Sequence, residues 1–222
     1  MLTPEIVTAN KERYINLIYS IKRDADLDGL VKKLENSDWF VAPASTKYHS
    51  CFEGGLVDHC LKVYDTLVGF LKVLYPGEED EVRVTSNCPY THDSVKIVTL
   101  LHDFDKMNKY EKTVRNKKHY HENGKKSDEM GKFDWIALSS YQKKDIKEHR
   151  DLFVLGTHGE NSVFMTETFV PLSPEEHSAI LNHHALFDNP NLEVGTLYTR
   201  YPLACLLHLA DMASAHCIEE NE

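Results

Sequence analysis

The sequence has few cysteines, and their spacing suggests neither disulfide bridges nor a thiolate metal site. Five cysteines are spread over 222 residues, and no two of them form a Cys-x-x-Cys pair. An odd, widely spaced set argues against a disulfide framework and against zinc held by thiolates. We therefore expect reduced thiols that are buried or half-buried.

Long apolar runs are missing as well. No stretch approaches the roughly 18 apolar residues that a membrane span needs, and the first residues lack the apolar core of a signal peptide. We therefore expect a cytoplasmic protein with no membrane partner. Hydrophobic residues make up 41% and charged residues 27% of the chain. This balance suits one folded domain over residues 1–222 and excludes disordered and low-complexity classes.

Positive charge is in short supply and unevenly distributed. The chain has 25 lysines and arginines against 35 acidic residues, a formal net charge of -10. Such a chain is repelled by a polyanion, so long nucleic acid is disfavoured as a partner. Residues 104–150, by contrast, contain 13 basic and 8 acidic residues. This basic segment favours a local anionic ligand, and the alternative is a solvated loop rich in lysine.

Hydrophobic spacing near 3.6 residues dominates the chain and predicts an all-α fold, a helical bundle. The breaks between periodic stretches carry proline, glycine or asparagine. The expected helices cover about 3–20, 25–36, 54–75 and 91–107, a short stretch after 159, a stretch from 173, and about 196–216. Residues 3–36 are expected to pack on a core of about 40–216.

Residues 109–150 break the helical pattern. They combine lysines with scattered aromatic residues and the turn-like sequence Glu122-Asn-Gly-Lys. This composition predicts a small hairpin-like excursion from the bundle, with a little strand in it.

Thirteen histidines are many for this length, and some stand where core residues belong. His59 comes three residues after Leu56, and His102 four after Val98, so each shares a helix face with apolar side chains. Asp211 lies in the apolar stripe of the last expected helix. A buried carboxylate must be paired, hydrogen-bonded or bound to a metal, because an isolated buried charge is very costly. For any one histidine alone, a hydrogen-bonded core residue is the more common explanation.

Together with Asp103, these residues supply two imidazoles and two carboxylates. A mixed set of nitrogen and oxygen ligands suits Mn, Fe, Co, Ni or Zn and requires no thiolate. We therefore expect a divalent transition metal as cofactor.

These residues carry a resemblance to a known family. The sequence resembles the HD superfamily of metal-dependent phosphohydrolases, whose signature is His, then His-Asp, then Asp on separate helices of an all-helical domain. The matching segments, in this order, are Phe52-Glu-Gly-Gly-Leu-Val-Asp-His59, Thr99-Leu-Leu-His102-Asp103-Phe-Asp-Lys106 and Leu206-Leu-His-Leu-Ala-Asp211. The Gly-Gly-Leu-x-x-His part is similar to the 3′ to 5′ exoribonuclease branch.

Two further segments resemble the extra-histidine segments of small HD hydrolases of phages and bacteria. They are Gly156-Thr-His-Gly-Glu-Asn-Ser-Val163 and Ala179-Ile-Leu-Asn-His183-His-Ala-Leu-Phe-Asp188. The resemblance covers roughly residues 40–216.

The resemblance implies one or two metal ions and a ligand set for each. The residues that would hold the first metal are His59, His102, Asp103 and Asp211. His158 and His183 would hold a second metal, with Asp103 as the bridging ligand. The family pattern places the ligand at the first histidine of the pair 183–184. His184 is therefore expected outside the ligand set. Both His184 and His49 are expected among the residues that face the substrate.

The chain departs from the family at one position. The family has glycine before the lysine that follows His-Asp, where this chain has Asp105. Glycine permits close backbone approach. An aspartate there either turns outward, adds an acidic group near the metal, or disfavours some phosphate poses. Lys106 matches the family's lysine, which would neutralise a phosphate.

The implied chemistry is phosphate hydrolysis by a metal-activated water. Asp103 would orient or bridge that water, and Lys106 would stabilise charge on the transferred group. Glu160, close to His158, is a candidate for proton transfer. Within the basic segment, the candidates for contact with the substrate are Arg115, Lys117 and Lys118.

We therefore expect an enzyme that hydrolyses phosphate ester or anhydride bonds of small nucleotides, either mono- or triphosphates of nucleosides or deoxynucleosides. One alternative is a 3′ to 5′ nuclease or phosphodiesterase on RNA or DNA, which the Gly-Gly-Leu-x-x-His segment suggests. Another is a regulatory module that binds metal and nucleotide without turnover, and the last is an inert core with structural histidines. The sequence names neither the metal, the nucleotide nor the oligomeric state.

Overall fold

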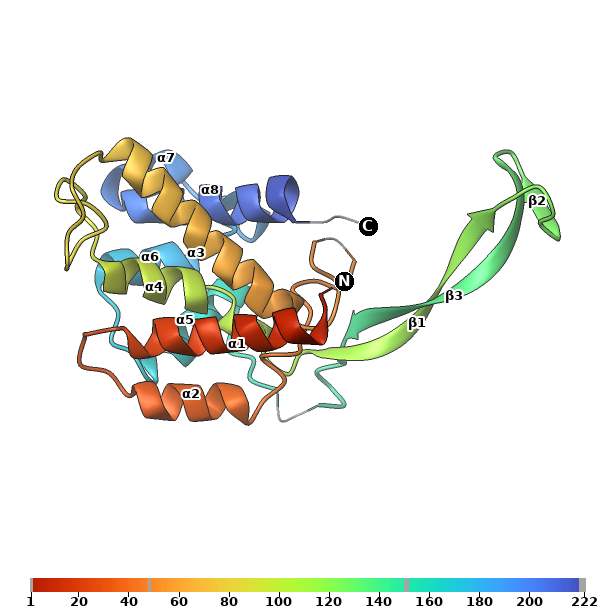
Figure 1. The fold of residues 1–222 in the computed structure, drawn as a ribbon, viewed down its shortest axis with the longest axis horizontal. Helices are drawn as coiled ribbons and strands as arrows, with labels where there is room; N and C mark the ends of the chain where they lie inside the picture. Colours follow the sequence, from red (N-terminus) through yellow and green to blue (C-terminus); the bar gives the residue numbers. More distant parts are fainter. Residues whose placement is uncertain (1, 48, 150–151, 220–222) are drawn as a thin grey trace.

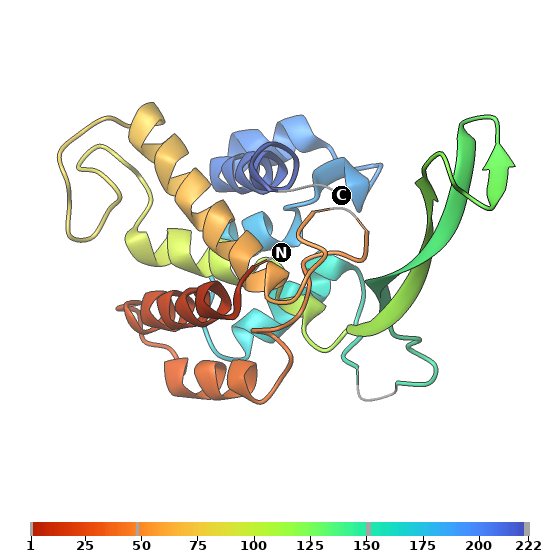
Figure 2. The same cartoon turned by 45° about the vertical axis from the view of Figure 1, so that its right-hand side comes forward.

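The computed structural model describes residues 2–47, 49–149 and 152–219. Figure 1 shows a helical body from which a long, thin arm of strands projects, and the arm projects from the body in Figure 2 as well. The helices are α1 (Pro4–Tyr19), α2 (Leu27–Glu35), α3 (Gly55–Leu74), α4 (His92–Leu101), α5 (His158–Glu167), α6 (Pro174–Leu181), α7 (Val194–Arg200) and α8 (Pro202–Ala213). Short helical turns follow α4, α6 and α8, namely η1 (Phe104–Lys106), η2 (Ala185–Phe187) and the π-helical η3 (Ser214–Ile218).

Helix α3 runs through the body and packs against α1, α4 and α8. Its buried side includes Leu56, Cys60, Val63, Leu67 and Leu71. His59 lies on the same buried side, so the packing that fixes α3 also fixes this imidazole. Helix α1 is joined to α4 by Tyr14, whose buried hydroxyl donates to the carbonyl of Leu100 at 2.5 Å.

Two glycines shape the start of α3. Gly54 has a φ of 80°, in the left-handed region that glycine adopts without strain. A β-carbon on Gly55 would lie 2.1 Å from the carbonyl oxygen of Ser50. The glycine pair therefore lets the loop that carries Ser50 lie directly against the first turn of α3. The Ser50 hydroxyl in turn donates to the carboxylate of Glu219 at 2.5 Å.

Side-chain caps determine where α5 and α6 begin. Thr157 and Glu160 form a capping box at α5, and Ser173 and Glu176 form another at α6. The box at α5 makes His158 the first residue of its helix.

The all-α prediction is wrong, because the protein combines its helices with an antiparallel sheet. Strand β1 (Tyr110–Tyr120) pairs with β3 (Gly131–Lys143), and β2 (Lys126–Asp128) pairs with the other edge of β3. These strands occupy the segment for which the sequence predicts only a small hairpin-like excursion. The sheet leaves most of its side chains in solvent. Its strands therefore lack the apolar alternation that marks a strand packed on a core.

The single last helix that the sequence predicts is in fact two helices. Helix α7 ends at Arg200 and α8 begins at Pro202, which has no amide hydrogen with which to continue a helical hydrogen-bond ladder. Helix α8 then passes into η3, which is followed directly by Glu219. Within the described ranges, no helix is long and apolar enough to cross a membrane.

A buried ion pair joins the segment before α2 to α6. A variant that lacks this pair is expected to be less stable than the wild type. Arg23 donates to both carboxylate oxygens of Glu176, at 2.6 and 2.7 Å, and Glu176 is buried. Arg23→Ala is expected to lower the free energy of unfolding by about 3 kcal/mol, because it leaves a carboxylate buried without its partner. Urea unfolding measures the loss.

The matched control is Arg13→Ala. Arg13 makes a similar two-bond pair with Asp65, but both side chains are exposed, so we expect a loss below about 1 kcal/mol. Burial alone would raise the pKa of Glu176, but its hydrogen bonds with Arg23 lower it below the ordinary 4.5. The pair therefore stabilises the fold above that pH, and its contribution is lost as the pH falls through the lowered pKa. Equal losses in the two variants, or a difference that persists in strong acid, would contradict this account.

Candidate metal centre

The residues expected to hold a first metal meet inside the body. His59 comes from α3, His102 follows α4, and Asp211 comes from α8. Their ligand atoms all lie within 4.8 Å of one another. Nε2 of His59 is 3.3 Å from Nε2 of His102 and 3.2 Å from Oδ1 of Asp211. These three buried side chains can together hold a metal ion.

A second group of ligand atoms lies beside the first. Its members, again within 4.8 Å of one another, are Asp103, His158, His183 and His184. Oδ1 of Asp103 faces this group, at 2.7 Å from His158 Nε2 and 3.6 Å from His183 Nε2. Oδ2 of Asp103 faces the first group, at 3.6 Å from His59 Nε2 and 3.5 Å from His102 Nε2. The Asp103 carboxylate therefore lies between the two groups, where a bridging ligand would be.

Two of the imidazoles are held by backbone carbonyls through their Nδ1 atoms. His102 donates from Nδ1 to the carbonyl of Thr99 at 2.8 Å, and His183 donates to the carbonyl of Ile180 at 2.7 Å. In each case the acceptor stands three residues earlier in the chain. A neutral imidazole with its proton on Nδ1 carries a lone pair on Nε2, which is the form that binds a metal.

Three more imidazoles are held through Nδ1 by carboxylates. The acceptors are Glu219 for His59 (2.6 Å), Asp105 for His158 (3.0 Å) and Asp188 for His184 (3.0 Å). A carboxylate that accepts from the outer nitrogen of a histidine orients the ring and makes it a better metal ligand.

Without an added proton or a metal ion, inward-facing nitrogens of this arrangement lack partners. The Nε2 atoms of His59 and His102 face each other at 3.3 Å. Nε2 of His183 is buried and has no hydrogen-bond partner among the described residues. Buried polar atoms in proteins nearly always have a partner, so an orphaned one calls for an explanation. A metal ion among these nitrogens would supply it.

The pKa values of the histidines agree with this need for positive charge. Burial alone would lower the pKa of His59, but Asp211 and Glu219 raise it to about 10. Burial lowers the pKa of His102 to about 3, so this ring stays neutral. In the metal-free protein a proton on His59 supplies the positive charge, and a metal ion would have to displace it.

Asp105 turns inward, so the alternative in which its side chain points outward is wrong. One of its oxygens accepts from Nδ1 of His158, and the other is paired with Lys109. Its backbone amide donates to the hydroxyl of Ser162 at 3.2 Å. Asp105 is therefore an acidic group near the ligands that orients His158, and Lys109 offsets its charge.

Lys106 and His49 also lie at the centre. Nζ of Lys106 is 2.7 Å from Oδ2 of Asp103. Burial would lower the pKa of Lys106, but Asp103 raises it above its usual value, so the ammonium group stays charged. The ring of His49 lies 5.0 Å from that of His59, and burial lowers its pKa to about 4. His49, His59 and Glu219 form a third group of candidate ligand atoms, in which His59 and Glu219 are already bonded to each other.

The other candidates lie apart from the metal groups. Glu160 caps α5 through the backbone amide of Thr157 and is exposed. Arg115, Lys117 and Lys118 lie on β1, five to eight residues beyond Tyr110. That distance is about 17 to 27 Å along an extended strand. Arg115 and Lys117 line a different cavity, together with Lys47.

Two of the three carboxylates that orient the histidines, Asp188 and Glu219, were not predicted from the sequence. The contact between Asp188 and His184 could have been predicted from the sequence. Asp188 stands four residues after His184, a spacing at which side chains meet on a helical turn. No local sequence pattern points to the contact between Glu219 and His59, because only the packing of η3 beside α3 brings the two residues together.

No protein-family profile, curated protein or solved structure matches this chain. The assignment of the centre therefore depends on its geometry.

The carboxylates that orient the histidines can be substituted one at a time. Each substitution is expected to affect only one of the two metal sites. Glu219 orients His59 of the first group, and Asp105 orients His158 of the second. Glu219→Gln is expected to weaken the binding of one ion by about 10- to 100-fold, and Asp105→Asn the binding of the other by a similar factor. Calorimetric titration of the metal-free protein with Mn²⁺ measures both dissociation constants.

The two variants control for each other. Each is expected to keep one site at the wild-type affinity, and the double variant is expected to bind both ions more weakly. A wild-type protein that binds no ion, or a variant that leaves both constants unchanged, would refute the assignment.

Proposed function

We propose that this protein is a metal-dependent phosphohydrolase of the HD type. The observation that carries the proposal is the place of Asp103, whose carboxylate lies between two groups of inward-facing imidazole nitrogens. The order of ligand residues along the chain supports it too, since it is the order of the HD signature that the sequence resembles. In this chain the projecting sheet lies between α4, which precedes His102, and α5, which begins at His158.

The residues of the centre have distinct tasks in this proposal. A divalent ion held there would polarise a phosphate ester and lower the pKa of a water molecule, so that a nucleophile is available near neutral pH. Asp103 accepts a hydrogen bond from the attacking water and so orients it. Lys106, charged and 2.7 Å from Asp103, offsets negative charge that develops on the phosphate.

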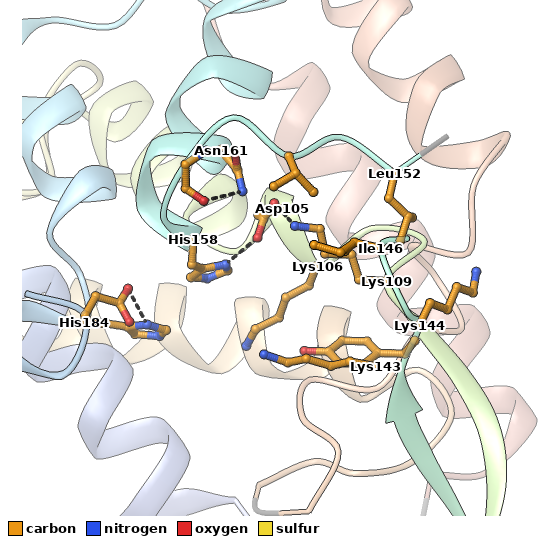
Figure 3. Close-up of a pocket in the computed structure, with 14 residues that line it drawn as sticks. Asp105, Lys106, Lys109, Lys143, Lys144, Ile146, Leu152, His158, Asn161 and His184 are labelled. Atoms are coloured by element: carbon orange, nitrogen blue, oxygen red, sulfur yellow. Dashed lines mark hydrogen bonds and ion pairs between the residues drawn. The ribbon is translucent and has the colours of Figure 1, made fainter. Parts of the chain in front are cut away.

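The substrate that we propose is a small nucleotide. A cavity of about 360 Å³ opens beside the second group, and Asp105, Lys106, His158 and His184 are among its lining residues (Figure 3). Sites for small molecules span roughly 300 to 1,000 Å³, so this cavity suits a single nucleotide. The net charge of -10 disfavours a long polyanion as well.

One observation favours a second candidate, a nuclease or phosphodiesterase on RNA or DNA. Lys47, in the loop before α3, lines a separate cavity of about 280 Å³ together with Arg115 and Lys117 of the arm, and a phosphate backbone would find positive charge there. The two candidates respond differently to salt. Binding of a polymer weakens steeply as salt rises, whereas hydrolysis of a small nucleotide depends on salt much less.

Removal of the bridging carboxylate tests the proposal. Asp103→Asn is expected to lower kcat by about 1,000-fold or more, because an amide is a poor ligand and several kcal/mol of charge stabilisation are lost. The measurement is phosphate release from a panel of nucleoside mono- and triphosphates with Mn, Co, Ni, Zn or Mg.

Asp65→Asn is the matched control, because this carboxylate is exposed and pairs only with Arg13 among the described residues. It is expected to keep the wild-type kcat. Equal activity of wild type and Asp103→Asn would contradict the proposal. Binding of metal and nucleotide without any product would support the non-catalytic module instead.

A further inference from the structure

The cavity beside the second metal group has a basic part and an apolar part. Its basic part is formed by Lys106, Lys109, Lys143 and Lys144, and its apolar part by Ile146, Leu152 and Val154. Lys143 is the last residue of β3 and pairs with Tyr110, the first residue of β1. The root of the arm therefore forms part of the cavity.

Three of the four lysines already have partners. These are Asp103 for Lys106, Asp105 for Lys109 and the carbonyl of Asn108 for Lys144. Within residues 2–47, 49–149 and 152–219, no oxygen is bonded to the ammonium group of Lys143. In Figure 3 the side chains of Lys143 and Lys106 both extend toward the side on which His158 and His184 lie. The exposed Lys143 thus adds a positive charge without a described acidic partner to the cavity that His158 and His184 also line.

The carboxylates that line the cavity do not compensate Lys143. Asp105 is bonded to His158 and Lys109, and Asp188 is bonded to His184. An anion that enters the cavity therefore meets a positive charge that no described acidic residue has neutralised.

The apolar part of the cavity is left partly uncovered. Ile146 is 55% exposed and Val154 is 51% exposed, although both line a concave surface. Small-molecule sites are lined mainly by apolar side chains, with a few charged groups that fix the orientation of the ligand. A ligand with an apolar or aromatic part would cover these side chains.

We propose that the cavity binds a phosphate monoester that carries an aromatic or heterocyclic group. Lys143 binds the phosphate together with Lys106, and the ring lies against Ile146 and Leu152. A monoester carries nearly two negative charges near neutral pH, which suits two ammonium groups better than the single charge of a diester. This inference rests on the proposed function, since it places the phosphate next to the metal groups.

Inorganic phosphate is the first probe, because it has the charge of the monoester and is not turned over. Its dissociation constant is measured by calorimetry on the Mn²⁺-loaded protein. Lys143→Ala is expected to weaken phosphate binding about tenfold, because a charge-assisted hydrogen bond is lost. Lys132→Ala removes a lysine from the far end of the same strand and is expected to change nothing. Equal affinity in wild type and Lys143→Ala, or equal weakening in both variants, would overturn the site.

The second probe tests the apolar part. Adenosine 5′-monophosphate and glycerol 3-phosphate carry the same phosphate, and only the first has a ring. The wild type is expected to prefer the nucleotide in kcat/KM by about tenfold or more, since ring burial adds roughly the effect of one apolar side chain. Ile146→Asn is expected to reduce this preference, whereas Val114→Asn, an exposed position on the arm, is expected to keep it. Equal kcat/KM for the two esters would overturn the assignment of a ring.

The inference and the proposed function fail in different ways. If the loaded protein binds phosphate through Lys143 and hydrolyses no ester, the proposed function is wrong and the phosphate site is correct. If esters are hydrolysed and Lys143→Ala changes neither phosphate affinity nor KM, the proposed function is correct and the inference is wrong.

Discussion

The interior of this protein is organised around imidazole rings whose Nδ1 protons already have acceptors. Backbone carbonyls hold two of the rings and carboxylates hold three, so each is left with Nε2 as the atom that faces inward. Helices α3, α4, α5, α6 and α8 carry or adjoin these rings, and their packing brings the nitrogens together around Asp103. Buried acceptors without donors are costly. Packing that brings these nitrogens together therefore favours a proton or a cation among them.

Helical spacing was enough to predict most helices and to single out His59, His102 and Asp211. His158 and His183 were expected only from the family resemblance, and His184, expected outside the ligand set, lies within the second group. His59 and Asp211 stand in apolar stripes of helical spacing, and a polar residue in such a stripe is visible without a structure. The arm was underestimated because β1 and β3 pair mainly with each other and bury little. Lys143 could not be found, because its place beside the centre depends on a cross-strand pairing 33 residues away along the chain, with Tyr110. The sequence marked Asp105 as unusual. The direction of its side chain could not be predicted, because it depends on the position of α5, which carries His158.

The loops that support the centre contain the unusual backbone conformations. Outside glycine, the described residues with positive φ are Ser50, Asn108 and Ala185. Ser50 bonds to the carboxylate that holds His59, Asn108 follows η1 and is bonded to Asp38, and Ala185 comes directly after His184. Left-handed backbone at such residues costs of order 1 kcal/mol or more each, and persists where the surroundings enforce it. The surroundings of the centre therefore enforce a left-handed backbone at three residues in separate loops.

We propose that the inward-facing Nε2 atoms, together with Asp103 and Asp211, hold metal ions. Anomalous X-ray diffraction from crystals grown with Mn²⁺ tests it most directly, because the anomalous signal locates the ion itself. We expect one peak bounded by His59, His102 and Asp211, and a second bounded by His158 and His183, with Asp103 between them. Crystals without a peak in either group, or with ions bound only elsewhere and the imidazoles bonded to one another, would contradict it.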